Sequence, residues 1–185
     1  MPLATPQPRR HLHTRTITCE GFLRDDGLWD IEARLVDVKT YPFPNEFRGG
    51  SIPPGEPMHD LLLRVTLDLD LVIHAIDASS EHYPYRACSR APAAMRSLIG
   101  LRIGGGFLKR VKERIGVSRG CTHLIEMMST IATTSYQTMN AFMEEKARAE
   151  SRREKPHYLD SCIAMRCDGE VVRREWPEFF TGPKP

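Results

Sequence analysis

Alternating apolar and polar residues predict strands in the first half of the chain. The alternation is clearest at residues 29–35 and 61–69, where Trp, Ile, Val, Leu or Ala occupies every second position. A two-residue period turns one set of side chains toward a core and the other toward solvent. Residues 16–24 and 71–78 are further strand candidates, and Asp-Asp-Gly at 25–27 is a turn signal. We therefore expect antiparallel hairpins.

A helical period replaces the alternation after residue 90. Residues 91–99 and 107–115 predict two short helices, followed by Gly100 and Gly116 as terminating residues. A third helix is predicted from about residue 119 to 148. Its apolar stripe repeats every three or four residues and consists of Leu124, Met128, Ile131, Ser135, Met139 and Phe142.

The remaining segments are expected to be loops or a last hairpin. Residues 41–57 are rich in Pro and Gly and predict a long loop. Residues 162–167 and 170–176, separated by Asp-Gly at 168–169, predict a hairpin. Strands that precede helices indicate an α+β fold, in which an antiparallel sheet packs against a helical layer that includes one long helix in the second half of the chain.

Length and local composition predict one domain with a disordered or loosely docked N-terminal arm and a flexible C-terminal tail. A chain of 185 residues is long enough to bury a substantial core. Residues 1–15 are expected to form a disordered or loosely docked arm, because they contain three prolines near the start. Residues 16–177 would form the single domain, and residues 178–185 a flexible tail.

Composition narrows the classes of function and the compartment. The net charge of +2 is too small to argue for nucleic acid binding, and no apolar run approaches the length of a membrane span. The N-terminus lacks the apolar core of a signal peptide. Five cysteines are then expected to be reduced thiols in a cytoplasmic protein. Gly104-Gly105-Gly106 lacks the Gly-Lys-Ser/Thr of a phosphate loop, so no nucleotide cofactor is expected.

A Cys-x-His pair at the start of the long helix is the first candidate for chemistry. Cys121 should lie in the first helical turn, where free N–H groups and the helix dipole favour a thiolate. His123 follows two residues later and reaches the thiol only if that turn is irregular. Two interpretations of the pair have equal weight. In the first, Cys121 is a reactive thiol or a metal ligand; in the second, Cys121 is a small packing residue and His123 is a polar residue at the helix start.

A polar segment after the strand predicted at residues 71–78 is the second candidate for chemistry. His82, Tyr85, Arg86 and Cys88 follow one another closely. An arginine can bind a carboxylate or phosphate, a tyrosine can donate to an oxyanion or stack on a ring, and a histidine can act as acid or base. A structural loop with surface tyrosines is an equally weighted alternative.

Two further positions beside the strands carry ligand-type side chains. His59 and Asp60 precede the clearest strand, and Asp77 lies at the end of the next one. Asp60 can orient a histidine or bind a metal, but it can also be a turn residue. Asp77 can act in catalysis or cap the following loop.

The chain resembles a bacterial family catalogued only as domain of unknown function 2889. The matching segments are GEPMHDLLLRVTLDLDLVIHAIDA at 55–78, HYPYRAC at 82–88 and GCTHL at 120–124. The resemblance extends over roughly residues 15–176. It implies no activity.

A more distant resemblance is to U-type iron–sulfur cluster scaffold proteins. His59 and Asp60 after Gly55 would take the place of the first scaffold Cys and Asp, Cys88 that of the second Cys, and Cys121 that of the third. The first cysteine is absent here. The resemblance implies a ligand set of two thiolates, an imidazole and a carboxylate, which suits zinc or iron; His123 would add an imidazole.

Three functions are compatible with these features. The first is an enzyme, a hydrolase or lyase for acyl or aromatic acid-type substrates, with Cys121 as nucleophile or metal ligand and with His82, Tyr85, Arg86 and Asp77 as further catalytic residues. The second is a carrier of a metal, sulfur or an iron–sulfur cluster. The third is an accessory protein whose cysteines only pack. The Met-rich long helix can bury a homodimer face as readily as a core.

Overall fold

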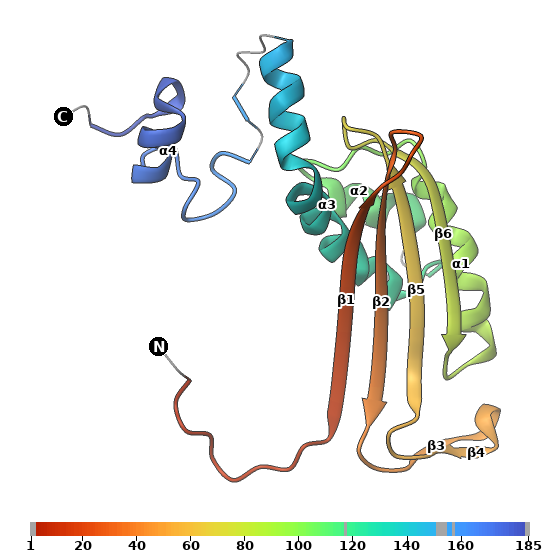
Figure 1. The fold of residues 1–185 in the computed structure, drawn as a ribbon. Coiled ribbons are helices and arrows are strands. Elements are labelled where there is room, and N and C mark those ends of the chain that lie inside the picture. Colours follow the sequence, from red (N-terminus) through yellow and green to blue (C-terminus); the bar gives the residue numbers. More distant parts are fainter. Residues whose placement is uncertain (1–2, 117, 151–154, 157, 184–185) are drawn as a thin grey trace. The chain divides into compact units, whose positions relative to one another are not determined.

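The computed structural model describes residues 3–116, 118–150, 155–156 and 158–183 (Figure 1). Its larger strands are β1 (His13–Leu23), β2 (Trp29–Lys39), β5 (Pro57–Leu67) and β6 (Ile73–His82). The helices are α1 (Ala91–Met95), α2 (Phe107–Ile115), α3 (Thr122–Ala149) and α4 (Glu170–Glu175). The α+β arrangement expected from the sequence is thereby confirmed.

The four long strands form one antiparallel sheet in the order β1-β2-β5-β6. The alternation of the sequence is visible in their burial, since Ile31, Ala33 and Leu35 are buried while Arg34 between them is exposed. Helices α1, α2 and α3 lie on the apolar face (Figure 1). The opposite face carries charged pairs, such as Arg64 with Glu32 at 2.7 Å. The sheet therefore has one core face and one polar face.

The stripe of α3 supplies the helical side of the core. Leu124, Met128, Ile131 and Met139 are fully buried, as the period predicts. Phe142, also assigned to the stripe, is 43% exposed. Helix α1 ends at Met95, earlier than expected, because a 3-10 turn at Arg96–Leu98 takes over the last residues.

The Pro/Gly-rich segment 41–57 is more ordered than the predicted loop. It contains a short hairpin of β3 (Phe43–Asn45) and β4 (Gly50–Ile52), joined by the 3-10 turn Glu46–Arg48. Asn45 explains this order: its Oδ1 accepts from the Arg48 N–H at 3.0 Å, and its Nδ2 donates to the Pro84 carbonyl at 3.0 Å. The second bond holds the segment against the chain that follows β6.

The chain clusters into two compact units, Met1–Asn140 and Ala141–Pro185, with the boundary inside α3. The single domain expected for residues 16–177 stays a prediction. The expected N-terminal arm is shorter than 15 residues, because pairing with β2 begins at His13. Among the described residues, no helix has the length and apolar content needed to cross a bilayer.

The hairpin predicted near the C-terminus is wrong. Residues 162–167 form turns, and residues 170–175 form α4. The Asp160 carboxylate accepts from the Cys167 N–H at 2.9 Å, which stabilises the turns, and one helical face buries Val172 beside Leu159 and Cys167. In the expected tail, Thr181 N–H donates to the Cys167 carbonyl at 2.9 Å, while residues 184–185 lie outside the described part.

Close approach of β1 to α3 predicts that Gly21 cannot be enlarged. A Cβ atom on Gly21 would lie 2.1 Å from Thr138 Oγ1 and 2.8 Å from its Cβ. We expect Gly21→Ala to lower the free energy of unfolding by about 2 kcal/mol in urea denaturation, because strand and helix must separate. Gly105→Ala is the control, since no atom lies within 4 Å of its added Cβ, and should change stability by less than about 0.5 kcal/mol. Equal stability of both variants would contradict this packing.

Candidate functional site

A buried carboxylate near the end of β2 organises the candidate site. Asp37 follows Ile31, Ala33 and Leu35 on the core face and is only 2% exposed. In the sheet register, Arg15 of β1 and His59 of β5 lie directly opposite it on either side. Cross-strand partners share a face of the sheet. The register alone therefore brings a guanidinium and an imidazole to this carboxylate.

Arginine and histidine nitrogens contact both oxygens of Asp37. Arg15 Nε donates to Oδ1 at 2.8 Å and Arg15 Nη2 to Oδ2 at 2.9 Å, a bidentate pair. His13 Nε2 lies 3.0 Å from Oδ1, and His59 Nδ1 lies 3.1 Å from Oδ2. Burial raises the pKa of the Asp37 carboxyl, but Arg15, His59 and His13 together outweigh it, so the net pKa lies below the ordinary value. Asp37 is therefore an anion at neutral pH.

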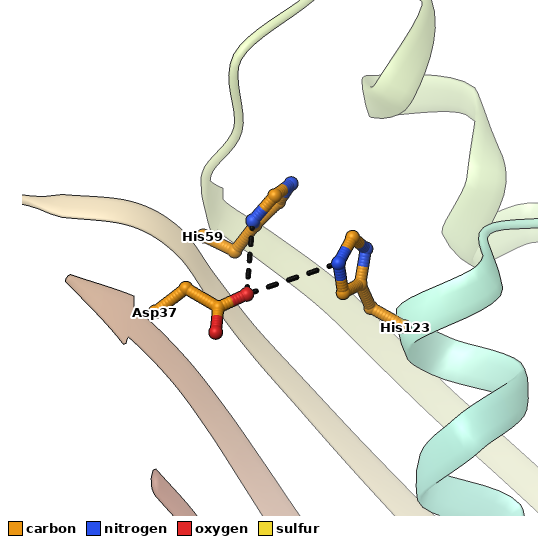
Figure 2. Close-up of side chains that lie close together, drawn as sticks. All are labelled: Asp37, His59 and His123. Atoms are coloured by element: carbon orange, nitrogen blue, oxygen red, sulfur yellow. Dashed lines mark hydrogen bonds and ion pairs between the residues drawn. The ribbon is translucent and has the colours of Figure 1, made fainter. Parts of the chain in front are cut away.

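The start of α3 brings a second imidazole to the same carboxylate. His123 Nε2 lies 3.8 Å from Asp37 Oδ2, and the rings of His59 and His123 are tilted against each other with centroids 4.1 Å apart (Figure 2). Arg15 Nη1 also donates to Glu126 of α3 at 2.6 Å. These contacts fix the first turns of α3 on the β1–β2–β5 part of the sheet.

Cys121 and His123 form a thiol–imidazole pair. Cys121 immediately precedes α3, and its Sγ lies 3.7 Å from His123 Nδ1. Burial raises the pKa of the Cys121 thiol. The His123 side chain and the backbone N–H groups of Leu124 and His123 lower it by a larger amount, so the net pKa is below its ordinary value. The same hydrogen bond raises the pKa of His123 against the opposing effect of burial. Both shifts favour a thiolate–imidazolium pair.

Two glycines set the position of Cys121. Gly116 has φ of 76° and ends α2, a conformation that an L side chain rarely adopts. A Cβ on Gly120 would lie 2.4 Å from Ile115 Cγ2. The absence of side chains at these positions lets the connection pack against the end of α2, and Cys121 then begins the next helix.

A cavity of about 760 Å³ opens beside the thiol–imidazole pair. Cys121, His123 and His59 line one part of it, and apolar or aromatic side chains such as Phe43 and Leu61 line another. Its size is in the range of small-molecule sites. Three of its polar side chains, those of Cys121, His123 and His59, lie next to one another.

Three side chains of the cluster have the spacing of a metal site. Ligand atoms of Asp37, His59 and His123 all lie within 4.8 Å of one another. Two imidazoles and a carboxylate are ligands that zinc and iron accept. The bidentate Arg15 opposes this use, because it already neutralises the carboxylate and would repel a divalent cation.

Five of the residues singled out in the sequence line the same cavity. They come from β5, from the segment after β6 and from the start of α3, and they are His59, Tyr85, Cys88, Cys121 and His123. The irregular first turn required for contact between Cys121 and His123 is present, because Cys121 lies outside the helix proper. Three sequence segments thus meet at one site.

Other candidate residues lie elsewhere. Asp60 follows His59 on the strand and so points to the opposite face, where its carboxylate binds Arg34 at 2.8 and 2.7 Å. His82 lies on that face, with Nδ1 3.9 Å from Asp60 Oδ2. Asp77 is exposed there as well and lines a separate hollow.

Arg86 contacts an aromatic ring instead of the cavity. Its guanidinium lies over the ring of Phe47, 5.5 Å from the ring centroid. It is not among the residues that line the cavity, whereas Arg90 and Arg119 are. The arginine that the sequence indicated and those beside the thiol are therefore different residues.

Sequence reasoning did not identify Asp37, Arg15 or His13. A signal was present, because Asp37 continues the apolar alternation of Ile31, Ala33 and Leu35 and so places an acid on a core face. Such a carboxylate must find cationic partners. Which residues supply them depends on the strand register, which the sequence pattern left open.

The comparisons with known proteins establish the family. Residues 13–137 match the model of a family described as "Protein of unknown function (DUF2889)". The match covers more than half of the chain, so the chain belongs to this family, as its sequence segments suggested. No curated protein and no solved structure matches the chain. The resemblance to U-type scaffold proteins stays a prediction.

Removal of the Asp37 charge should destabilise the protein in a pH-dependent manner. We expect Asp37→Asn to lower the free energy of unfolding by about 3 kcal/mol at pH 7, since it leaves Arg15 without its buried partner. The folded-state pKa is below the unfolded one, so the carboxylate's contribution is complete above about pH 4 and is lost as the pH falls through the folded-state value. In urea denaturation, the difference in the free energy of unfolding between the wild type and Asp37→Asn should be smaller at pH 3 than at pH 7.

Asp77→Asn is the matched control for this substitution. Asp77 is exposed on the polar face, so its amide variant should stay within about 0.5 kcal/mol of the wild type at both pH values. A loss for Asp37→Asn that does not depend on pH would contradict the proposed charge network.

Proposed function

We propose that this protein is a cysteine-dependent hydrolase of acyl substrates. The observation that carries the proposal is the contact between Cys121 Sγ and His123 Nδ1 at 3.7 Å, at the wall of a cavity large enough for a small molecule. A thiol next to an imidazole and at a helix start has the arrangement of an activated nucleophile. No nucleotide or redox cofactor is needed for this chemistry.

The reaction would proceed through a thioester. The Cys121 thiolate attacks the acyl carbonyl carbon, and the leaving group departs with the proton held by His123. A water molecule, deprotonated by His123, then attacks the thioester carbonyl. Cleavage of the C–S bond releases the carboxylic acid and returns the thiolate, while the proton from water remains on His123.

Asp37 and His59 would act as positioning residues. Asp37 Oδ2 lies 3.8 Å from His123 Nε2, on the side of the ring opposite Cys121. This carboxylate favours the imidazolium that the nucleophile requires. His59, hydrogen-bonded to the same oxygen, packs against the ring and limits its rotation. Nucleophile, base and carboxylate then follow one another as in other thiol hydrolases.

A second candidate function is metal binding, either for catalysis or for delivery. The convergence of ligand atoms from Asp37, His59 and His123 within 4.8 Å favours it. Zinc or iron would occupy the space between these atoms and leave a coordination position open. His123 would then use Nε2 for the metal and Nδ1 for Cys121.

Acyl transfer to Cys121 tests the first function. We expect p-nitrophenyl acetate to acetylate Cys121, with a burst of p-nitrophenol, because contact with His123 lowers the pKa of the thiol and so favours the nucleophilic thiolate. Intact-protein and peptide mass spectrometry should locate one acetyl group on Cys121. His123→Asn should slow acetylation at pH 7 by about 100-fold, within the usual range for loss of a general base.

Cys88→Ser is the matched control for this experiment. Cys88 lines the same cavity, and its thiol has no hydrogen bond to an imidazole among the residues that the structure describes. This variant should be acetylated at the wild-type rate. Acetylation spread over several cysteines, or unchanged in His123→Asn, would exclude Cys121 as an activated nucleophile.

Zinc binding tests the second function. If the cluster is a metal site, untagged protein should bind about one Zn²⁺ per chain by elemental analysis and calorimetry, and His59→Asn should lose most of this affinity. His74→Asn is the control, because exposed His74 bonds only to Asp68, at 2.8 Å, among the described residues. Equal zinc content in the two variants would rule out this cluster as the ligand set.

A further inference from the structure

The charges around the cavity indicate what kind of acyl substrate fits. Resting on the hydrolase proposed above, we infer that the substrate carries an anionic group, a carboxylate or phosphate, and that Arg90 and Arg119 bind it while the acyl carbon faces Cys121. The inference assigns these two arginines a role in specificity. The remaining part of the substrate would be apolar or aromatic.

The cavity wall is basic and contains no acid among the described residues. Its ionisable side chains are Arg90, Arg119, His59, His123 and the tyrosine and cysteine groups, with neither Asp nor Glu. The nearby Asp37 is already neutralised by its bidentate Arg15. Focusing of a positive field in a concave site attracts anions and raises their local concentration.

The two arginines have no carboxylate partner within the described part of the chain. Arginines on the sheet and near it, such as Arg15, Arg34 and Arg64, each bind an aspartate or glutamate. Arg90 and Arg119 are exposed, line the cavity and form no such ion pair with any described residue. They are therefore available for an anion from solution.

Both arginines line the same cavity as the thiol. Arg119 precedes Cys121 by two residues, and its Nη2 lies 3.3 Å from where a Cβ of Gly116 would be. The missing side chain at Gly116 thus leaves room for the guanidinium at the start of α3. Arg90 ends the 3-10 turn Arg86–Arg90, directly precedes α1 and lines the same cavity.

The rest of the lining favours an apolar or aromatic body. Phe43, Met58, Leu61 and Tyr83 line the cavity together with the exposed Tyr85. Aromatic and thioether side chains accommodate rings and alkyl chains. A short apolar or aromatic acyl group with an anionic end therefore matches the cavity in both shape and charge.

The inference is tested by alkylating Cys121 with a charged and a neutral reagent. We expect the ratio of rate constants for iodoacetate and iodoacetamide to be higher at Cys121 than for free glutathione at low ionic strength. Arg90→Gln/Arg119→Gln should lower this ratio by about tenfold, a typical effect of charge steering, while the iodoacetamide rate stays unchanged. Arg90→Lys/Arg119→Lys should keep most of the ratio, and added salt should reduce it.

Arg86→Gln is the matched control, because Arg86 has the same charge and lies in the same turn as Arg90 but packs on Phe47 outside the cavity lining. It should keep the wild-type ratio. A rapid iodoacetamide reaction at Cys121 with the same ratio in the double Gln variant would overturn the anion inference and leave the hydrolase intact. A Cys121 that reacts no faster than exposed Cys162 would overturn the hydrolase itself.

Discussion

A carboxylate on the core face of a sheet is stable only when cations and hydrogen-bond donors surround it, and Asp37 imposes this requirement here. Its partners come from three other elements: Arg15 from β1, His59 from β5 and His123 from α3. Because each partner must reach the same two oxygens, the charge network fixes the relative positions of these elements. These contacts hold β1, β2, β5 and the start of α3 together where the cavity begins.

The contact between Cys121 and His123 depends on this arrangement. Cys121 and His123 lie only two residues apart, and in a regular helix their side chains would diverge. They meet because Cys121 stands just outside α3 while the ring of His123 is held by Asp37 and His59. The same network keeps the negative charge of Asp37 close to the His123 ring, and Asp37 itself is buried. A basic cavity and a buried acid are thus compatible within one small site.

Predictions from the sequence succeeded where one hydrophobic periodicity, that of a strand or of a helix, runs through a segment. In the middle of β2 and of β5 every second residue is buried, as at Ile31, Ala33 and Leu35, and residues 107–115 form the helix that their spacing indicates. The predictions failed where a few side-chain contacts determine the local secondary structure. The expected C-terminal hairpin is replaced by α4, since the Asp160 carboxylate and burial of Val172 outweigh a weak strand pattern. The short hairpin β3–β4 likewise depends on the two hydrogen bonds of Asn45.

The sequence by itself determined the fold class, the core faces of the strands and the family, and it indicated His59, Cys88, Cys121 and His123 as candidate residues, which line one cavity. Hydrophobic periodicity and local motifs carry this information, because each depends on neighbours in the chain. Only the tertiary structure decided that Asp37 and Arg15 join the site, that Asp60 and Asp77 face the other way, and that Arg90 and Arg119 border the cavity. Those facts follow from strand register and helix docking, which bring together residues as far apart as 15 and 126.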